Sequence, residues 1–186
     1  LGPVLPAAPE VHAASFPGAG DDLGVGPGVV RGLILTFNAG SSTIKLGVYE
    51  AGAEEPRLLA RASMDFRDDP FELWLKMEGK QFACPLSADP DDLDTVLQQG
   101  FDALSGHFDL SRLAVIGHRV VHGGDIFTRP ARIDDEVLGR IEALAALAPL
   151  HQPQSLRLIR TMRRLYPDVA QVASFERPHD PYWHHS

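Results

Sequence analysis

The strongest constraint on the fold is a pair of strand-like segments separated by a short turn of small residues. Residues 33–37 form a β-branched apolar run (Leu-Ile-Leu-Thr-Phe), and residues 44–48 alternate apolar with other side chains. A period of two on both sides of the turn-prone stretch 38–43 (Asn-Ala-Gly-Ser-Ser-Thr) predicts a β-hairpin. Three more strands are expected to extend it into an antiparallel meander, at 58–64, 71–77 and 81–86.

In the second half of the chain the apolar residues change to helical spacing. These stripes predict three helices, at 93–104, 137–145 and 156–165, the last of which follows Pro153. Short apolar runs predict two further strands, at 113–116 and 169–175. Strands followed by alternating helices and strands indicate a layered α/β domain.

The beginning of the chain differs in texture from the rest. The first 32 residues hold 7 of the 17 glycines and 5 of the 15 prolines, which leaves little to pack and much backbone entropy to lose on ordering. We therefore expect residues 1–31 to be a flexible tail.

Charge and cysteine content exclude several classes of protein. The chain has 25 Asp and Glu against 17 Lys and Arg, a formal net charge of −8, whereas binding to nucleic acid or a membrane surface requires a basic footprint. No stretch of about 18 apolar residues is present to span a bilayer. Cys84 is the single cysteine, so neither an internal disulfide nor a Cys-based zinc site is expected. We expect a cytoplasmic protein.

The turn at 38–45 is the first segment that could carry chemistry. Gly40 would let a ligand approach the backbone closely, and hydroxyl and backbone N–H groups can surround phosphate oxygens, with Lys45 adding a positive charge. The spacing is not that of a Walker A loop. An ordinary hairpin turn with a solvated lysine explains the same residues.

A second segment, Gly-His-Arg-Val-Val-His-Gly-Gly at 117–124, follows a predicted buried strand. Arg119 can bind a carboxylate or phosphate through two parallel hydrogen bonds, and Val121 offers an apolar wall. On a strand His118 and His122 would be about 13 Å apart, too far for one metal ion. Structural hydrogen bonding is the better interpretation of these histidines.

A third segment, Ala-Pro-Leu-His-Gln-Pro at 148–153, lies between two predicted helices. His151 could donate a hydrogen bond to a developing anion, or it could cap a helix.

Together the three segments resemble the acetate kinase (acetokinase) family, ATP-dependent carboxylate kinases of the actin-like ATPase superfamily. The family's first signature, N-x-G-S-S-[ST]-x-K after an apolar strand, occurs at 38–45. Its second, G-H-R-[IV]-V-H-G-G, is complete at 117–124, and its A-P-L-H-N-P segment occurs at 148–153 with Gln152 in place of Asn. The resemblance implies an actin-like (ribonuclease H-like) α/β domain, with a mixed sheet that contains an antiparallel meander and is flanked by helices.

The resemblance also implies a reaction, the reversible transfer of the ATP γ-phosphoryl group to acetate to give acetyl phosphate and ADP, with Mg²⁺. Each implied role falls on a position that matches a family motif. The implied roles are Mg²⁺ contact for Asn38, phosphate contact for Ser41, Thr43 and Lys45, carboxylate binding for Arg119, a methyl pocket of Val121 and Leu150, and support of the transferring group by His151.

The likeness runs from about residue 33 to 175 and covers only the front part of the family's length. It implies that residues 32–175 are an incomplete N-terminal domain and that residues 176–186 are a divergent tail. After Phe175 the family continues F-D-T-A-F-H, whereas this chain is one residue shorter there, with Glu176 in place of the catalytic aspartate. By resemblance the full-length enzyme is a homodimer, and this chain alone is expected to have little or no activity.

Two alternatives remain open beside acetate kinase. One is a propionate or butyrate kinase, because a single methylene is worth only about 1–3 kcal/mol of discrimination. The other is a non-catalytic remnant or binding module that retains the actin-like half. A serine hydrolase is a weak alternative, because no G-x-S-x-G elbow occurs.

Overall fold

The structure is a computed structural model that describes residues 31–52, 55–120, 123–124, 126–147 and 153–175. The predicted tail, apart from its last residue Arg31, and the predicted divergent segment 176–186 lie outside the described residues. No helix in the described part of the chain is long and apolar enough to cross a membrane.

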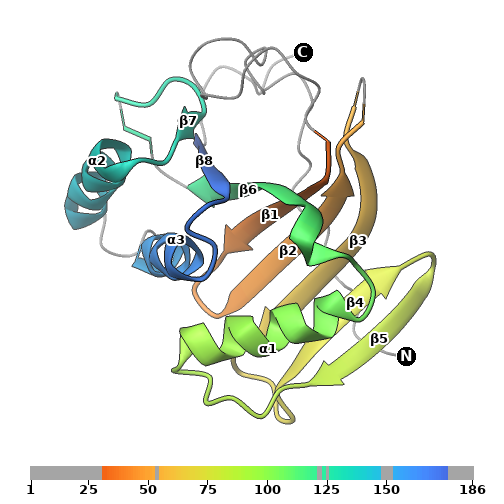
Figure 1. Ribbon diagram of the computed structural model, residues 1–186. Helices are drawn as coiled ribbons and strands as arrows, with labels where there is room; N and C mark the ends of the chain where they lie inside the picture. Colours follow the sequence, from red (N-terminus) through yellow and green to blue (C-terminus); the bar gives the residue numbers. More distant parts are fainter. Residues whose placement is uncertain (1–30, 53–54, 121–122, 125, 148–152, 176–186) are drawn as a thin grey trace, which may run out of the picture.

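One mixed sheet of eight strands forms the centre of the domain, in the order β5-β4-β3-β2-β1-β6-β8-β7 (Figure 1). Strands β1 to β5 form an antiparallel meander, β1, β6 and β8 run parallel, and β7 pairs antiparallel with β8 at the edge. The strands are β1 (Leu33–Ala39), β2 (Thr43–Glu50), β3 (Arg57–Asp65), β4 (Glu72–Met77), β5 (Lys80–Pro85), β6 (Leu113–Val120), β7 (Ala131–Arg132) and β8 (Ala170–Phe175).

The predicted hairpin, meander and α/β class are confirmed, and two details differ from the sequence prediction. The strand predicted at 113–116 continues to Val120, because β1 and β8 pair with it on both sides beyond its apolar run. Strand β7 was not predicted, since two residues are too few to show a period.

All three described α-helices lie on one face of the sheet (Figure 1). They are α1 (Leu93–Ser105), α2 (Asp135–Leu147) and α3 (Pro153–Leu165), and a short 3₁₀ turn spans Leu110–Arg112. Leu35 and Phe37 of β1 are buried in the larger hydrophobic cluster, which includes apolar residues of α1 and α3, and the Phe37 ring meets Phe101 of α1 edge to face at 6.4 Å. Because side chains alternate along a strand, Thr36 and Asn38 lie on the opposite face.

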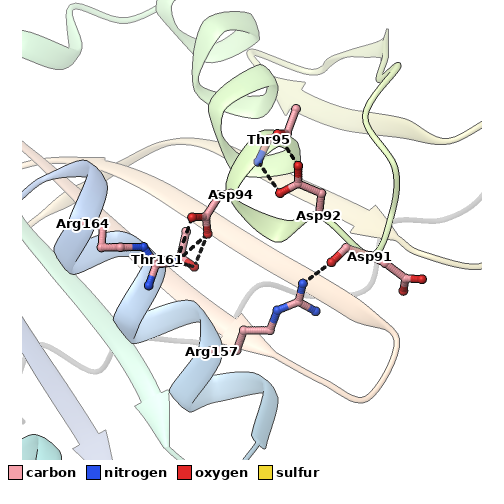
Figure 2. Close-up of polar contacts among 7 residues, drawn as sticks. All are labelled: Asp91, Asp92, Asp94, Thr95, Arg157, Thr161 and Arg164. Atoms are coloured by element: carbon pink, nitrogen blue, oxygen red, sulfur yellow. Dashed lines mark hydrogen bonds and ion pairs between the residues drawn. The ribbon is translucent and has the colours of Figure 1, made fainter.

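Helices α1 and α3 are joined by a small polar cluster as well as by apolar packing (Figure 2). The buried hydroxyl of Thr161 donates to Asp94 Oδ1 at 2.7 Å, and Arg164 Nη2 donates to the same carboxylate at 2.7 and 2.8 Å. These bonds, that of Thr161 foremost, lower the pKa of Asp94. The carboxylate at the start of α1 therefore links that helix to the last turns of α3.

We predict that Thr161→Val lowers the free energy of unfolding by about 1–2 kcal/mol, because it removes the hydrogen bond that the buried Thr161 hydroxyl donates to a charged acceptor. Chemical denaturation at neutral pH measures this difference. A lowered carboxyl pKa stabilises the fold above the carboxyl's ordinary pKa, and this contribution is lost as the pH falls through the lowered value. The difference between the variant and the parent should therefore shrink in acid.

The matched control is Thr95→Val on the exposed side of α1, where the hydroxyl bonds Asp92 at 2.6 Å. We expect this variant to lose less than half as much stability, because water replaces an exposed partner. Equal losses in the two variants would show that the cluster between α1 and α3 has no special role.

Candidate functional site

Three of the predicted site residues lie in one row across the centre of the sheet. Asn38 of β1 pairs in register with Lys45 of β2 on one side and with Arg119 of β6 on the other. Paired residues on neighbouring strands share a face, so all three side chains lie on the face opposite the helices. With strands about 4.8 Å apart, the Cα atoms of Arg119 and Lys45 are separated by about 10 Å.

A hydrogen bond between Arg119 and Asn38 organises the row. Nη1 of Arg119 donates to Oδ1 of Asn38 at 3.1 Å, although the residues are 81 positions apart. A guanidinium is a planar fork of five N–H donors, and a bond to one of them restrains the orientation of the rest. Among the residues that the structure describes, Lys45 has no ion-pair partner. The row thus presents two positive charges on either side of an amide.

The two predicted hydroxyl residues lie at the end of the β1–β2 hairpin, Ser41 in the turn and Thr43 at the first position of β2. Ser41 is exposed and Thr43 is half-buried, and the turn is closed by a bond from the Gly40 N–H to the Thr43 carbonyl at 2.8 Å. A Cβ at Gly40 would lie 3.1 Å from the Thr43 hydroxyl, closer than ordinary contact. Glycine at position 40 therefore avoids a steric clash with the Thr43 hydroxyl.

The row extends beyond the residues that the sequence pointed out. Ser174 of β8 pairs with Arg119, and Ser63 of β3 pairs with Lys45, so both serines share the open face. Alternation along each strand shows which face a residue occupies. It does not show which residues of distant strands become neighbours, and for this reason neither serine was predicted.

His118, beside Arg119 in sequence, faces the helices. Its ring is 2% exposed, stacks on Phe37 at 5.7 Å, and has Nε2 2.8 Å from Oε1 of Gln171. Burial lowers its pKa to about 4, partly opposed by the bond to Gln171. The structural interpretation of this histidine is confirmed, since it holds β6 against β1 and β8 directly behind the Arg119 and Asn38 pair.

The other predicted site residues cannot be placed. Val121, Leu150, His151 and Glu176 lie outside the described residues, as does His122. Within the described part, no group of three or more His, Cys, Asp or Glu side chains is arranged to hold a metal ion.

The fold is similar to solved structures of propionate and acetate kinases. A propionate kinase from Francisella tularensis superposes with a TM-score of 0.68 at 29% identity, covering 78% of this chain and 37% of that protein. An acetate kinase from Porphyromonas gingivalis has a TM-score of 0.69 at 24% identity, which supports the fold alone, and covers 82% and 42% of the two chains. The described structure is therefore an α/β domain of the class found in acetate and propionate kinases.

Sequence comparison identifies the family. The model of the acetokinase family matches residues 33–181, and acetate kinase 1 of Neisseria meningitidis is 35% identical over 144 residues. A propionate kinase of Klebsiella pneumoniae is 36% identical over 144 residues. Each alignment covers 77% of this chain but only 36% and 34% of those proteins, so the chain spans about a third of their length. The chain belongs to the acetokinase family.

We predict that His118 makes the fold sensitive to acid. Its pKa lies near 4 in the folded protein against an ordinary value of 6.5, so the unfolded chain binds a proton in this interval that the folded chain does not. Stability should therefore fall as the pH drops from about 6.5 to 4, by about 3 kcal/mol from this residue at most. In His118→Gln, denaturation curves should show a flatter pH dependence.

His107→Gln is the control, because His107 is exposed on the surface. That variant should retain the parent's pH dependence, to which the carboxylates contribute equally in both proteins. If His118→Gln is as acid-sensitive as the parent, protonation of this ring does not destabilise the domain.

Proposed function

We propose that this chain carries the carboxylate- and phosphate-binding part of an acetate kinase, which transfers the γ-phosphoryl group of ATP to acetate to give acetyl phosphate and ADP. The observation that carries the proposal is the row of Arg119, Asn38 and Lys45 on the open face of the sheet. Family membership and the names of the relatives support the same reaction. Asn38 and Lys45 belong to the first family signature and Arg119 belongs to the second, so residues of both signatures lie in this row.

The row suits a reaction that depends on alignment and positive charge. Arg119, oriented by Asn38, can bind the acetate carboxylate, since the guanidinium fork matches its two oxygens. Lys45, two strands away on the same face, can contact phosphate oxygens of the nucleotide, together with Ser41 in the turn and Thr43 at the start of β2. Acceptor and donor would then lie next to each other, which is the main requirement of phosphoryl transfer.

The roles of four further residues remain predictions from the family resemblance. Val121 and Leu150 would form the methyl pocket, His151 would support the transferring phosphoryl group, and Glu176 would stand for the catalytic aspartate. The homodimer and the cytoplasmic location are likewise proposals for the whole protein.

The described residues do not fit a resident Mg²⁺ ion. Asn38 supplies one amide oxygen, and that oxygen accepts from a guanidinium, a cation that a metal ion would repel. No cluster of carboxylates accompanies it in the described part of the chain. Mg²⁺ is commonly held by one or two carboxylates together with the phosphates of a nucleotide. Arg119 and Lys45 would therefore bind the carboxylate and the phosphates directly, without a metal ion between them.

We predict that Arg119→Ala, in the chain extended through its downstream reading frame, lowers kcat/KM for acetate by several orders of magnitude. Arg119→Lys should recover only part of the loss, because an ammonium group cannot form the paired bonds. The measurement is acyl phosphate formation trapped with hydroxylamine, with acetate, ATP and Mg²⁺. Arg112→Ala, which removes an exposed arginine paired with Glu50, is the control and should stay near the parent. Near-normal turnover of Arg119→Ala would remove the carboxylate-binding role.

The same assay on the chain as given and on the extended chain tests the proposed function itself. Activity in the extended chain alone would establish an acetate kinase of which this chain is a part. A folded but inactive extended chain would favour the non-catalytic alternative.

Propionate is the second candidate substrate, because the chain is as similar to a propionate kinase as to acetate kinases. Turnover on C2, C3 and C4 acids distinguishes the two. A preference for the C3 acid over acetate would replace acetate kinase by propionate kinase.

A further inference from the structure

A second site lies at the far edge of the sheet, away from the row of Arg119, Asn38 and Lys45. A cavity of about 800 Å³ opens where the short edge strand β7 leaves β8. Its walls are the segments 126–134 and 167–171, together with Val137 of α2 and Arg163 of α3. None of Asn38, Ser41, Thr43, Lys45 and Arg119 lines it. Its volume falls within the range of small-molecule sites, about 300–1,000 Å³.

Three arginines from three parts of the fold line this cavity. Arg129 precedes β7, Arg132 lies in β7, and Arg163 is in the last turn of α3. Three arginines around one cavity contrast with the chain's net charge of −8. Guanidinium groups that converge on one cavity are the usual means by which proteins bind phosphate oxygens through paired hydrogen bonds.

Two carboxylates also line the cavity, Asp134 and Asp168, and one of them is already used. Oδ1 of Asp134 accepts from the Val137 N–H at 2.7 Å at the start of α2. Arg163 pairs with Asp135 at 2.7 Å, but that carboxylate is 95% exposed. An exposed ion pair contributes little stability, so an anion can compete for Arg163 at small expense.

The cavity also has an apolar wall beside its arginines. Ile126, a large hydrophobic residue, is 54% exposed. Next to it the ring of Phe127 stacks on Phe175 at 4.3 Å, which fixes that wall against β8. The apolar part of a bound ligand would cover Ile126, and the arginines would bind its charged end.

We propose that this cavity, defined by Arg129, Arg132 and Arg163, is a binding site for a small metabolite that carries two or more phosphate groups. The site lies apart from the row assigned to acetate and ATP. Ligand binding there would bridge β7, the edge strand of the sheet, to α3.

Calorimetric titration of the chain with inorganic pyrophosphate tests the proposal, with succinate titrated in parallel. We expect saturable binding of pyrophosphate that weakens by about tenfold or more in Arg129→Ala combined with Arg132→Ala. The matched control is Arg140→Ala combined with Arg160→Ala, which removes two exposed arginines paired with Glu136 and Glu142 outside the cavity. This control should bind as the parent does. Arg129→Glu, at an exposed position, provides a second variant should the double variant fail to fold.

Lys45→Ala separates this site from the proposed kinase site, because it should leave unchanged the pyrophosphate binding that depends on Arg129 and Arg132. Loss of binding in Lys45→Ala but not in the arginine variants would place the anion on the central row and overturn the proposal. An equal loss of affinity in the control double variant would show that binding depends on net charge alone and would refute the proposal. Absence of saturable pyrophosphate binding in the parent would refute it as well. Succinate binding as tight as pyrophosphate would overturn the assignment to phosphates.

Discussion

The parallel pairing of β1 with β6 is the constraint on which the rest of this structure depends. Strand β1 lies between β2, its hairpin partner, and β6, which is reached only after three more strands and helix α1. This pairing brings Asn38 and Arg119 into register and lets them form a hydrogen bond. A shift of one residue would turn Arg119 towards the helices and His118 towards the open face. Apolar burial on the helix face opposes such a shift, because it would bring polar groups into the core.

The two faces of the sheet therefore differ in role: one packs against the helices and the other carries the polar row. The face under the helices is buried, and a hydrogen bond between the buried His118 and Gln171 links β6 to β8 behind the polar row. The opposite face carries the row of Arg119, Asn38 and Lys45, with Ser63 and Ser174 at its sides. Rigid packing behind the strands holds the polar side chains in place, as a site for alignment requires.

Two groups of positive side chains stand out in this acidic chain. One is the central row, and the other is the edge cavity with its three arginines. The row is built on the regular pairing of long strands, whereas the cavity lies beside β7, a strand of two residues.

The sequence by itself determined the hairpin, the meander, the three helices and the family, because each depends on local periodicity or on contiguous signatures. It also identified Asn38, Lys45 and Arg119 singly, from residue type and motif. Only the tertiary structure decided that these three are neighbours, that Ser63 and Ser174 join them, and that Arg129, Arg132 and Arg163 share a cavity. The physical reason is that register between distant strands is set by burial of whole sheet faces, a property that no single segment of the chain contains.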